Sequence, residues 1–177
     1  PRMSALIIAS HVKEGLEMGR EEGLPEQVLK FVPMHHGTAR IEYFYQKAVS
    51  NAEEGDPDIP ESEFRYPGPK PDSKEAGILM LADSIEAASR SLDDPSPRQL
   101  ENLIDLIFSE RIDDGQLDDT DLTFRDLRLM KDTFLKMLLG IYHVRVKYPD
   151  QEEEAESSAV EGVSLHAEQP YAHVSIV

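Results

Sequence analysis

Two adjacent histidines, His35 and His36, follow Pro33 at the end of a segment with helical apolar periodicity, and Gly37 comes next. Neutral imidazole is the commonest side-chain ligand of transition metals, so a doublet at a helix end can direct two nitrogens into one pocket. A His-His pair is weak support by itself because solvated pairs are common. Its chemistry depends on the ligands that other segments bring to it.

Two further residues of ligand type lie in segments with apolar periodicity. His11 lies at the margin of an apolar stripe expected over residues 4–22, so its ring can point inward. Asp83 shares a helical face with apolar residues, where a lone carboxylate would pay a large desolvation cost unless something positive met it. A metal ion is one such partner, and a buried arginine such as Arg90 or a backbone cap is another. We predict that His11, His35, His36 and Asp83 form part of a site for two metal ions.

Composition limits the chemistry of this site. A chain of 177 residues suits one domain with a real core. It has no cysteine, so a metal must be held by imidazole and carboxylate, which suits iron, manganese or zinc. The net charge of −17 disfavours general binding of duplex nucleic acid. No apolar run approaches the roughly 20 residues that a membrane span needs.

The elements that must position these residues are all expected to be helices, because no strand pattern is convincing. The apolar faces of these helices are expected to include Leu6, Val28 and Met137. Pro and Gly break the pattern over residues 50–71, which predicts a long loop whose second half holds one shape. The domain is expected over residues 1–149, with a flexible acidic tail over residues 150–177. Helices are predicted at about residues 4–22, 24–33, 41–49 and 72–92, and from capping boxes at Ser96–Gln99 and Thr123–Asp126.

Four stretches of the chain together resemble a known family. They are residues 7–13, residues 27–38 with the histidine doublet, residues 64–71 with 73–75, and residues 80–84. In this order they are similar to the catalytic HD domain of the membrane-anchored 7TM-HD phosphodiesterases of the PgpH type, over about residues 4–149. The resemblance implies an all-α HD-domain helical bundle. It also implies hydrolysis of cyclic di-AMP to linear pApA with a pair of transition metals, iron or manganese, with zinc as an alternative.

The resemblance also implies a ligand set. His11, His35 and His36 would hold one metal, and Asp83 would help to hold the other. The family pattern begins with a histidine and a His-Asp dyad upstream of the position of His11, and this chain contains no His-Asp dipeptide. We therefore expect those ligands, and any membrane attachment, to come from a segment before residue 1, which leaves a partial site and impaired activity here. No catalytic acid or base is assigned within the chain.

Substrate contacts are expected from residues 64–74. Charge develops on the phosphate oxygens during phosphoryl transfer, so cations near the metals help to stabilise it. Arg65, Lys70 and Lys74 are the candidates, and Tyr66 or Tyr43 could stack on a base. The alternative is that the three cations form a solvated loop surface and that Tyr43 belongs to the core.

Two other functions remain open from the sequence. One is another HD-type hydrolase that acts on nucleotides or phosphomonoesters, since the sequence does not specify the base. The other is a non-catalytic module that binds a cyclic dinucleotide or a partner through the loop or the tail. The metal and the oligomeric state are also left open.

Overall fold

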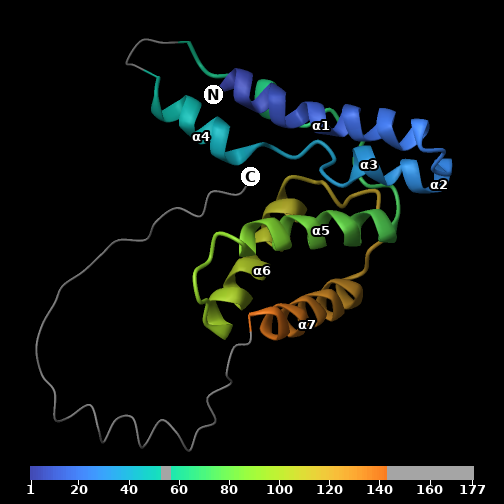
Figure 1. Ribbon diagram of the computed structural model, residues 1–177. Coiled ribbons are helices and arrows are strands. Elements are labelled where there is room, and N and C mark those ends of the chain that lie inside the picture. Colours follow the sequence, from blue (N-terminus) through green and yellow to red (C-terminus); the bar gives the residue numbers. More distant parts are fainter. Residues whose placement is uncertain (53–56, 143–177) are drawn as a thin grey trace, which may run out of the picture.

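The structure is a computed structural model that describes residues 1–52 and 57–142. These residues contain helices and no β-strand, which confirms the all-α prediction (Figure 1). The predicted tail at residues 150–177 lies outside the described residues. The elements are α1 (Arg2–Glu21), α2 (Glu26–Leu29), α3 (Phe31–Met34), α4 (Glu42–Ser50), the 3₁₀ helix η1 (Glu61–Phe64), α5 (Lys74–Ser89), α6 (Pro97–Asp113) and α7 (Phe124–Ile141).

Side-chain caps explain where the three long C-terminal helices begin. Capping boxes are present at Ser96–Gln99 and at Thr123–Asp126, as predicted, and they satisfy backbone N–H groups at the starts of α6 and α7. At the start of α5 the cap is a single bond, in which the Ala76 N–H donates to Ser73 Oγ at 3.4 Å. The two capping boxes were predicted because their members lie three residues apart, whereas the helix expected from about residue 72 begins instead after Ser73.

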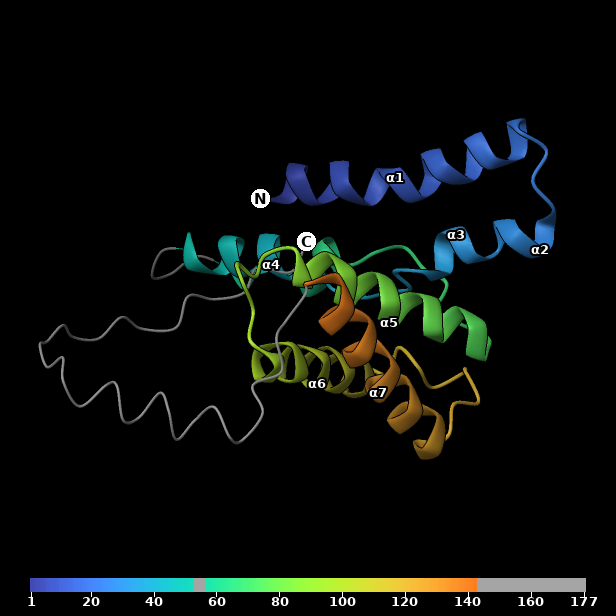
Figure 2. The same ribbon diagram turned by 60° about the horizontal axis from the view of Figure 1, so that its bottom comes forward.

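The helices form two groups with separate hydrophobic clusters. Helices α5, α6 and α7 enclose one cluster, centred on fully buried side chains such as Leu81 and Phe108. Helices α1 and α4 and η1 enclose the other, which includes Val12 and Phe64. Figure 2 shows α1 at one edge of the molecule, with α6 and α7 at the opposite edge. The predicted ligands come from the elements on either side of the boundary between these clusters.

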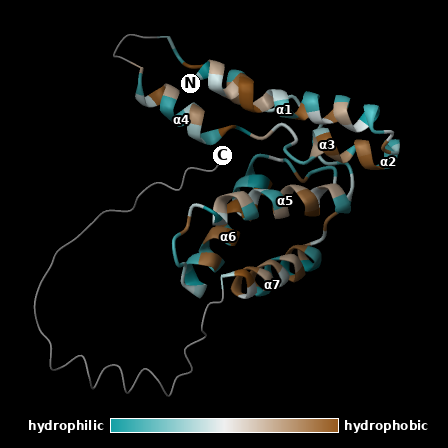
Figure 3. Cartoon of the chain, in the orientation of Figure 1, coloured by the Kyte–Doolittle hydropathy of each residue, from teal (hydrophilic) through white to brown (hydrophobic). Residues whose placement is uncertain are grey.

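Close packing brings α1 near the segment that carries the histidine doublet. A Cβ atom added at Gly19 would lie 2.6 Å from Leu29 Cδ2, so a larger residue there would force the Leu29 side chain to shift. Other apolar positions behave differently from the prediction: Leu6, Val28 and Met137 were expected inward but are exposed. Hydrophobic and hydrophilic residues alternate along α5 and α7 in Figure 3, and periodicity alone cannot say which apolar positions meet a neighbour.

The loop after α4 is anchored to the segment that follows the doublet. The Ile41 N–H donates to Phe64 O at 2.7 Å, and the Tyr66 N–H donates to Ala39 O at 3.0 Å. These two bonds flank a single antiparallel bridge between Arg40 and Arg65. The second half of the loop therefore follows a defined path, as expected. No helix among the described residues is both long enough and apolar enough to cross a bilayer.

Candidate metal centre

The predicted ligands are brought together from three parts of the fold. His11 projects from the middle of α1, and the doublet His35–His36 follows α3 directly. Asp83 lies in the middle of α5. Helix α3 packs against both α1 and α5, so it is the element that brings the three segments into contact.

The three imidazoles form a compact cluster. One nitrogen from each of His11, His35 and His36 can be chosen so that all three lie within 4.8 Å of one another. The Nε2 atoms of His11 and His35 are 3.4 Å apart. Two nitrogens bound to one tetrahedral ion at about 2.1 Å would be separated by about 3.4 Å. The spacing of these two nitrogens therefore fits a shared cation.

Backbone contacts determine which nitrogen of each ring carries its proton. His11 Nδ1 lies 2.5 Å from Ile8 O, and His35 Nδ1 lies 2.5 Å from Val32 O. A carbonyl oxygen only accepts, so these contacts assign the proton of each neutral ring to Nδ1. The two facing Nε2 atoms then both present lone pairs, which repel unless a proton or a metal ion lies between them. Metal-ligating histidines commonly use this arrangement, with the second nitrogen held by a backbone carbonyl.

His36 is held in the neutral form that a ligand needs. Burial lowers the pKa of His36 to about 3, with further contributions from His35, His11 and Arg111. Its ring stacks on Tyr66 with centroids 4.2 Å apart, and its Nδ1 lies 3.6 Å from Asp83 Oδ2. A proton therefore does not compete with a metal ion for His36 near neutral pH.

Asp83 lies next to the imidazole cluster without belonging to its three-nitrogen core. Burial raises the pKa of Asp83, and the nearby His35 opposes that rise. A carboxylate in this position can bind a cation directly or can orient the ring of His36. The contacts are compatible with both roles. The alternative partner Arg90 is excluded because it pairs with Glu86.

The position of the doublet depends on a buried glutamine that follows α6. Gln116 is fully buried; its Oε1 accepts from the Thr38 N–H at 3.0 Å, and its Nε2 donates to Thr38 Oγ1 at 2.9 Å. Gly37 has φ +54, and a Cβ atom there would lie 2.5 Å from Gln116 Oε1 and 2.7 Å from Met80 Cε. Glycine is therefore required for the chain to turn here after His36.

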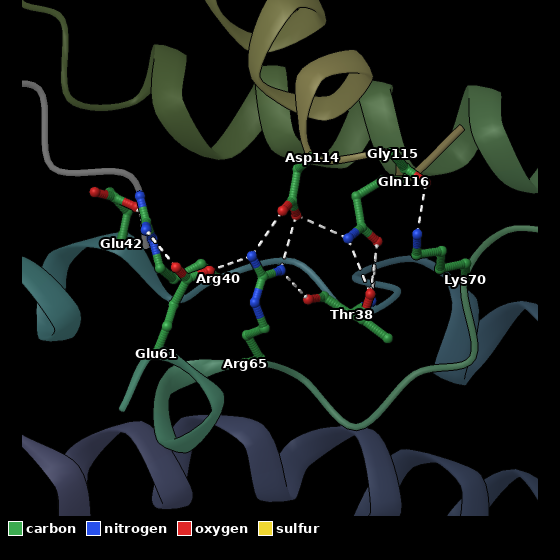
Figure 4. A network of polar contacts seen from close by, with 9 residues as sticks. All are labelled: Thr38, Arg40, Glu42, Glu61, Arg65, Lys70, Asp114, Gly115 and Gln116. Carbon is green, nitrogen blue, oxygen red and sulfur yellow. Dashed lines mark hydrogen bonds and ion pairs between the residues drawn. The ribbon is translucent and has the colours of Figure 1, made fainter. Parts of the chain in front are cut away.

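Two of the cations predicted to bind phosphate instead bind the turn after α6 in this structure. Figure 4 shows both terminal nitrogens of Arg65 donating to the carboxylate of Asp114, at 2.7 and 2.9 Å. Arg65 Nη1 also donates to Thr38 O at 2.7 Å. Arg65 also pairs with Glu61. Lys70 Nζ donates to Gly115 O at 2.8 Å. These contacts tie residues 64–71 to the segment that carries the doublet, so the two side chains brace the site.

The other residues predicted to contact substrate also have defined neighbours. Lys74 Nζ donates to Asp126 Oδ2 at 2.8 Å, in the capping box of α7. Tyr66 is buried, and its face is already occupied by the ring of His36. Tyr43 is partly exposed and packs edge-on against Phe44. Substrate binding by these side chains remains a prediction, and the contacts of Lys74 and Tyr66 favour structural roles.

Sequence analysis missed two polar residues beside the site, Gln116 and Arg111. Gln116 follows α6 and was given no role. Arg111 lies in the last turn of α6, three and four residues after the buried Phe108 and Ile107. That spacing puts its side chain on the inward face, and it could have been recognised from the helical period. No local pattern could have indicated that its hydrogen bonds among the described residues go to Ser84 and not to a carboxylate.

The chain is similar to known proteins over most of its length. Residues 2–88 match the family described as the HD domain. The chain is 45% identical over 150 residues to the cyclic-di-AMP phosphodiesterase PgpH of Bacillus subtilis (strain 168), covering 85% of this chain and 20% of that protein. It is 40% identical over 153 residues to the cyclic-di-AMP phosphodiesterase PgpH of Listeria monocytogenes, covering 86% and 21%. The chain thus spans about a fifth of the length of these curated relatives.

A solved structure resembles the fold over most of this chain. It is the crystal structure of the L. monocytogenes phosphodiesterase PgpH HD domain in complex with cyclic-di-AMP, which is 40% identical with a TM-score of 0.75. The match covers 84% of this chain and 68% of that one. At this identity the likeness extends beyond the fold to the family.

Proposed function

This chain belongs to the HD-domain family, and on that basis we propose that it is a metal-dependent phosphodiesterase domain that acts on a cyclic dinucleotide. Cyclic di-AMP, hydrolysed to linear pApA, is the substrate we favour, because two relatives are cyclic-di-AMP phosphodiesterases. The observation that carries the proposal is the imidazole cluster, in which His11 and His35 turn bare Nε2 atoms toward each other at 3.4 Å.

The proposed ligands of one ion are His11, His35 and His36, and Asp83 would help to hold a second. A bound divalent ion would supply a Lewis acid and lower the pKa of a bound water, and paired ions are typical of phosphodiester hydrolysis. The chain's own contribution is to hold the rings. Carbonyls orient His11 and His35, and burial keeps His36 neutral. The donor set contains only nitrogen and carboxylate oxygen, so manganese, iron or zinc would suit it.

Attachment of the domain to a membrane is a further part of the proposal. It rests on the resemblance to membrane-anchored phosphodiesterases, since the described helices include none suited to span a bilayer. Removal of an anchor should leave the metal chemistry unchanged, because every proposed ligand within this chain lies on described helices or directly after one.

Metal content is the first test. The protein is purified with Mn²⁺ or Zn²⁺, dialysed and measured by elemental analysis, beside His35→Ala and the control His166→Ala, which also removes one histidine but lies outside the described residues. We expect bound metal in the wild type and the control and its loss in His35→Ala. Asp83→Asn separates the two roles of that carboxylate. If Asp83 is a metal ligand, its loss lowers the number of metal ions bound per chain. If Asp83 only orients His36, its loss lowers the affinity for metal and leaves that number unchanged.

Hydrolysis is the second test. Cyclic di-AMP, cyclic di-GMP and a phosphomonoester are incubated with the metal-loaded protein, and the products are separated by chromatography. We expect linear dinucleotide from cyclic di-AMP and its loss in His35→Ala. Preferred cleavage of the phosphomonoester would favour a different HD-type hydrolase. Binding of cyclic di-AMP without turnover, in protein that holds no metal, would favour the non-catalytic module.

A further inference from the structure

One cation beside the imidazole cluster has no carboxylate partner among the described residues. Arg111 makes two hydrogen bonds among the described residues, both to Ser84 Oγ, at 3.2 Å from Nη2 and 3.4 Å from Nε. These bonds are long for a guanidinium group, which has five N–H donors. No ion pair within 4.0 Å involves Arg111 in this part of the chain.

Arg111 connects the imidazole cluster to an open cleft. It lines a small cavity together with His36, Tyr66 and Asp83. It also lines a neighbouring cleft of about 390 Å³. Arg40 and Arg111 line both the cavity and the cleft, so the two spaces adjoin. A volume of this size is typical of small-molecule sites. A ligand that entered the cleft would therefore meet Arg111 next to the imidazole cluster.

The other two arginines of the cleft are already neutralised. Arg40 pairs with Glu42 at 2.6 Å and with Glu61 at 3.2 Å. Arg65 pairs with Asp114 and Glu61. Burial lowers the pKa of Arg111, which means that its charge is held at an electrostatic cost that an anion would relieve. A substrate anion therefore has one guanidinium in the cleft whose donors are not committed to carboxylates.

We propose that Arg111 is a substrate-binding residue that grips a nonbridging phosphate oxygen next to the ion held by His11, His35 and His36. This inference rests on the proposed phosphodiesterase function and identifies the cation of that site. A planar guanidinium can donate two N–H bonds to one phosphate. Its charge also stabilises the negative charge that grows on those oxygens during phosphoryl transfer. The rest of the dinucleotide would occupy the cleft.

The test compares substitutions that separate phosphate binding from structural support. Arg111→Met removes the donors and keeps much of the side-chain volume, and Arg111→Lys keeps the charge without the bidentate fork. Arg90→Met is the control, because it removes a carboxylate-paired arginine that does not line the cleft. Ser84→Ala removes the one hydrogen-bond partner of Arg111. For each variant, metal content, kcat and KM on cyclic di-AMP in Mn²⁺, and the affinity for cyclic di-AMP are measured.

We expect Arg111→Met to lose about 100-fold in kcat/KM, a loss typical of removing one donor to a developing oxyanion, with its metal content unchanged. Arg111→Lys should recover part of that loss, and Arg90→Met should stay within about threefold of the wild type, since it removes an exposed, paired charge outside the cleft. A loss below about threefold in Arg111→Met would overturn the proposal. So would an equal loss in Ser84→Ala with the guanidinium still present, because that result would indicate a structural role.

The two proposals can fail separately. A wild-type protein that does not turn over cyclic di-AMP contradicts the phosphodiesterase function, and the role of Arg111 is then decided by affinity alone. Binding of cyclic di-AMP by the wild type that weakens about tenfold or more in Arg111→Met supports the anion site. Equal affinities in the two proteins, including no binding by either, overturn it.

Discussion

Replacing Gln116 by leucine should lower both the stability of the fold and its affinity for metal. Leucine is similar in size to glutamine but apolar, so it leaves the Thr38 N–H without the acceptor that lies 3.0 Å away. An orphaned buried donor costs about 1–3 kcal/mol, and losing the neutral bond from Gln116 Nε2 to Thr38 Oγ1 costs about 1 kcal/mol more. We therefore expect the free energy of unfolding to fall by about 2–4 kcal/mol.

The effect on metal binding follows from the place of Thr38 in the chain. Thr38 lies two residues after His36, so a shift of its backbone moves the doublet relative to His11. A loss of second-sphere support typically weakens metal affinity by about 10–100-fold. The control is Leu100→Ala, which opens a cavity in the hydrophobic cluster of α5, α6 and α7 and lowers the free energy of unfolding by about 2–5 kcal/mol. Leu100 lies about 16 Å along α6 from Arg111, the residue of that helix beside the imidazole cluster, so its replacement should leave the metal ligands in place.

Two assays decide the matter. Urea unfolding with the metal removed gives the stability of each variant, and titration with Mn²⁺ or Zn²⁺ against a competing chelator gives the affinity of the folded protein. We expect both values to fall in Gln116→Leu and only the stability to fall in Leu100→Ala. Wild-type metal affinity in Gln116→Leu, at reduced stability, would refute the view that Gln116 holds the doublet in place.

Three other predictions concern the fold and its charges. Gly37→Ala should lower the midpoint of thermal unfolding, because a Cβ atom at φ +54 costs about 1–2 kcal/mol before its clash with Gln116 is counted, and an unchanged midpoint would contradict this. Phe108→Ala should cost about 3–5 kcal/mol in urea unfolding, whereas Phe124→Ala at an 84% exposed position should stay within about 0.5 kcal/mol. Hydrogen bonds from Arg65 hold the pKa of Asp114 below its usual value, so the stabilisation is present above pH ~3.9 and disappears as the pH falls through the lowered pKa. The difference in stability between wild type and Asp114→Asn should shrink as the pH is lowered from 7 to 3, and a constant difference would exclude this linkage.

Sequence reasoning did well where the physical signal is local. Capping boxes at Ser96 and Thr123 were recognised because the cap and its partner lie three residues apart. The ligand types were also evident, since without cysteine only imidazole and carboxylate could hold a transition metal. The burial of individual apolar residues was less certain. Leu6 and Met137 have the right period, but no neighbouring element covers them.

The sequence by itself determined the helices, the residue types of the metal site and the family to which they belong. The tertiary structure decided which charges are free to act. Arg65 and Asp114 are 49 residues apart, and Thr38 and Gln116 are 78 residues apart, so neither partner can be read from the pattern around the other. Arg65 looked free in the sequence and is paired in the fold, whereas Arg111 looked ordinary and lacks a carboxylate partner among the described residues. The energy of an ion pair depends on distance in space, and only folding sets that distance.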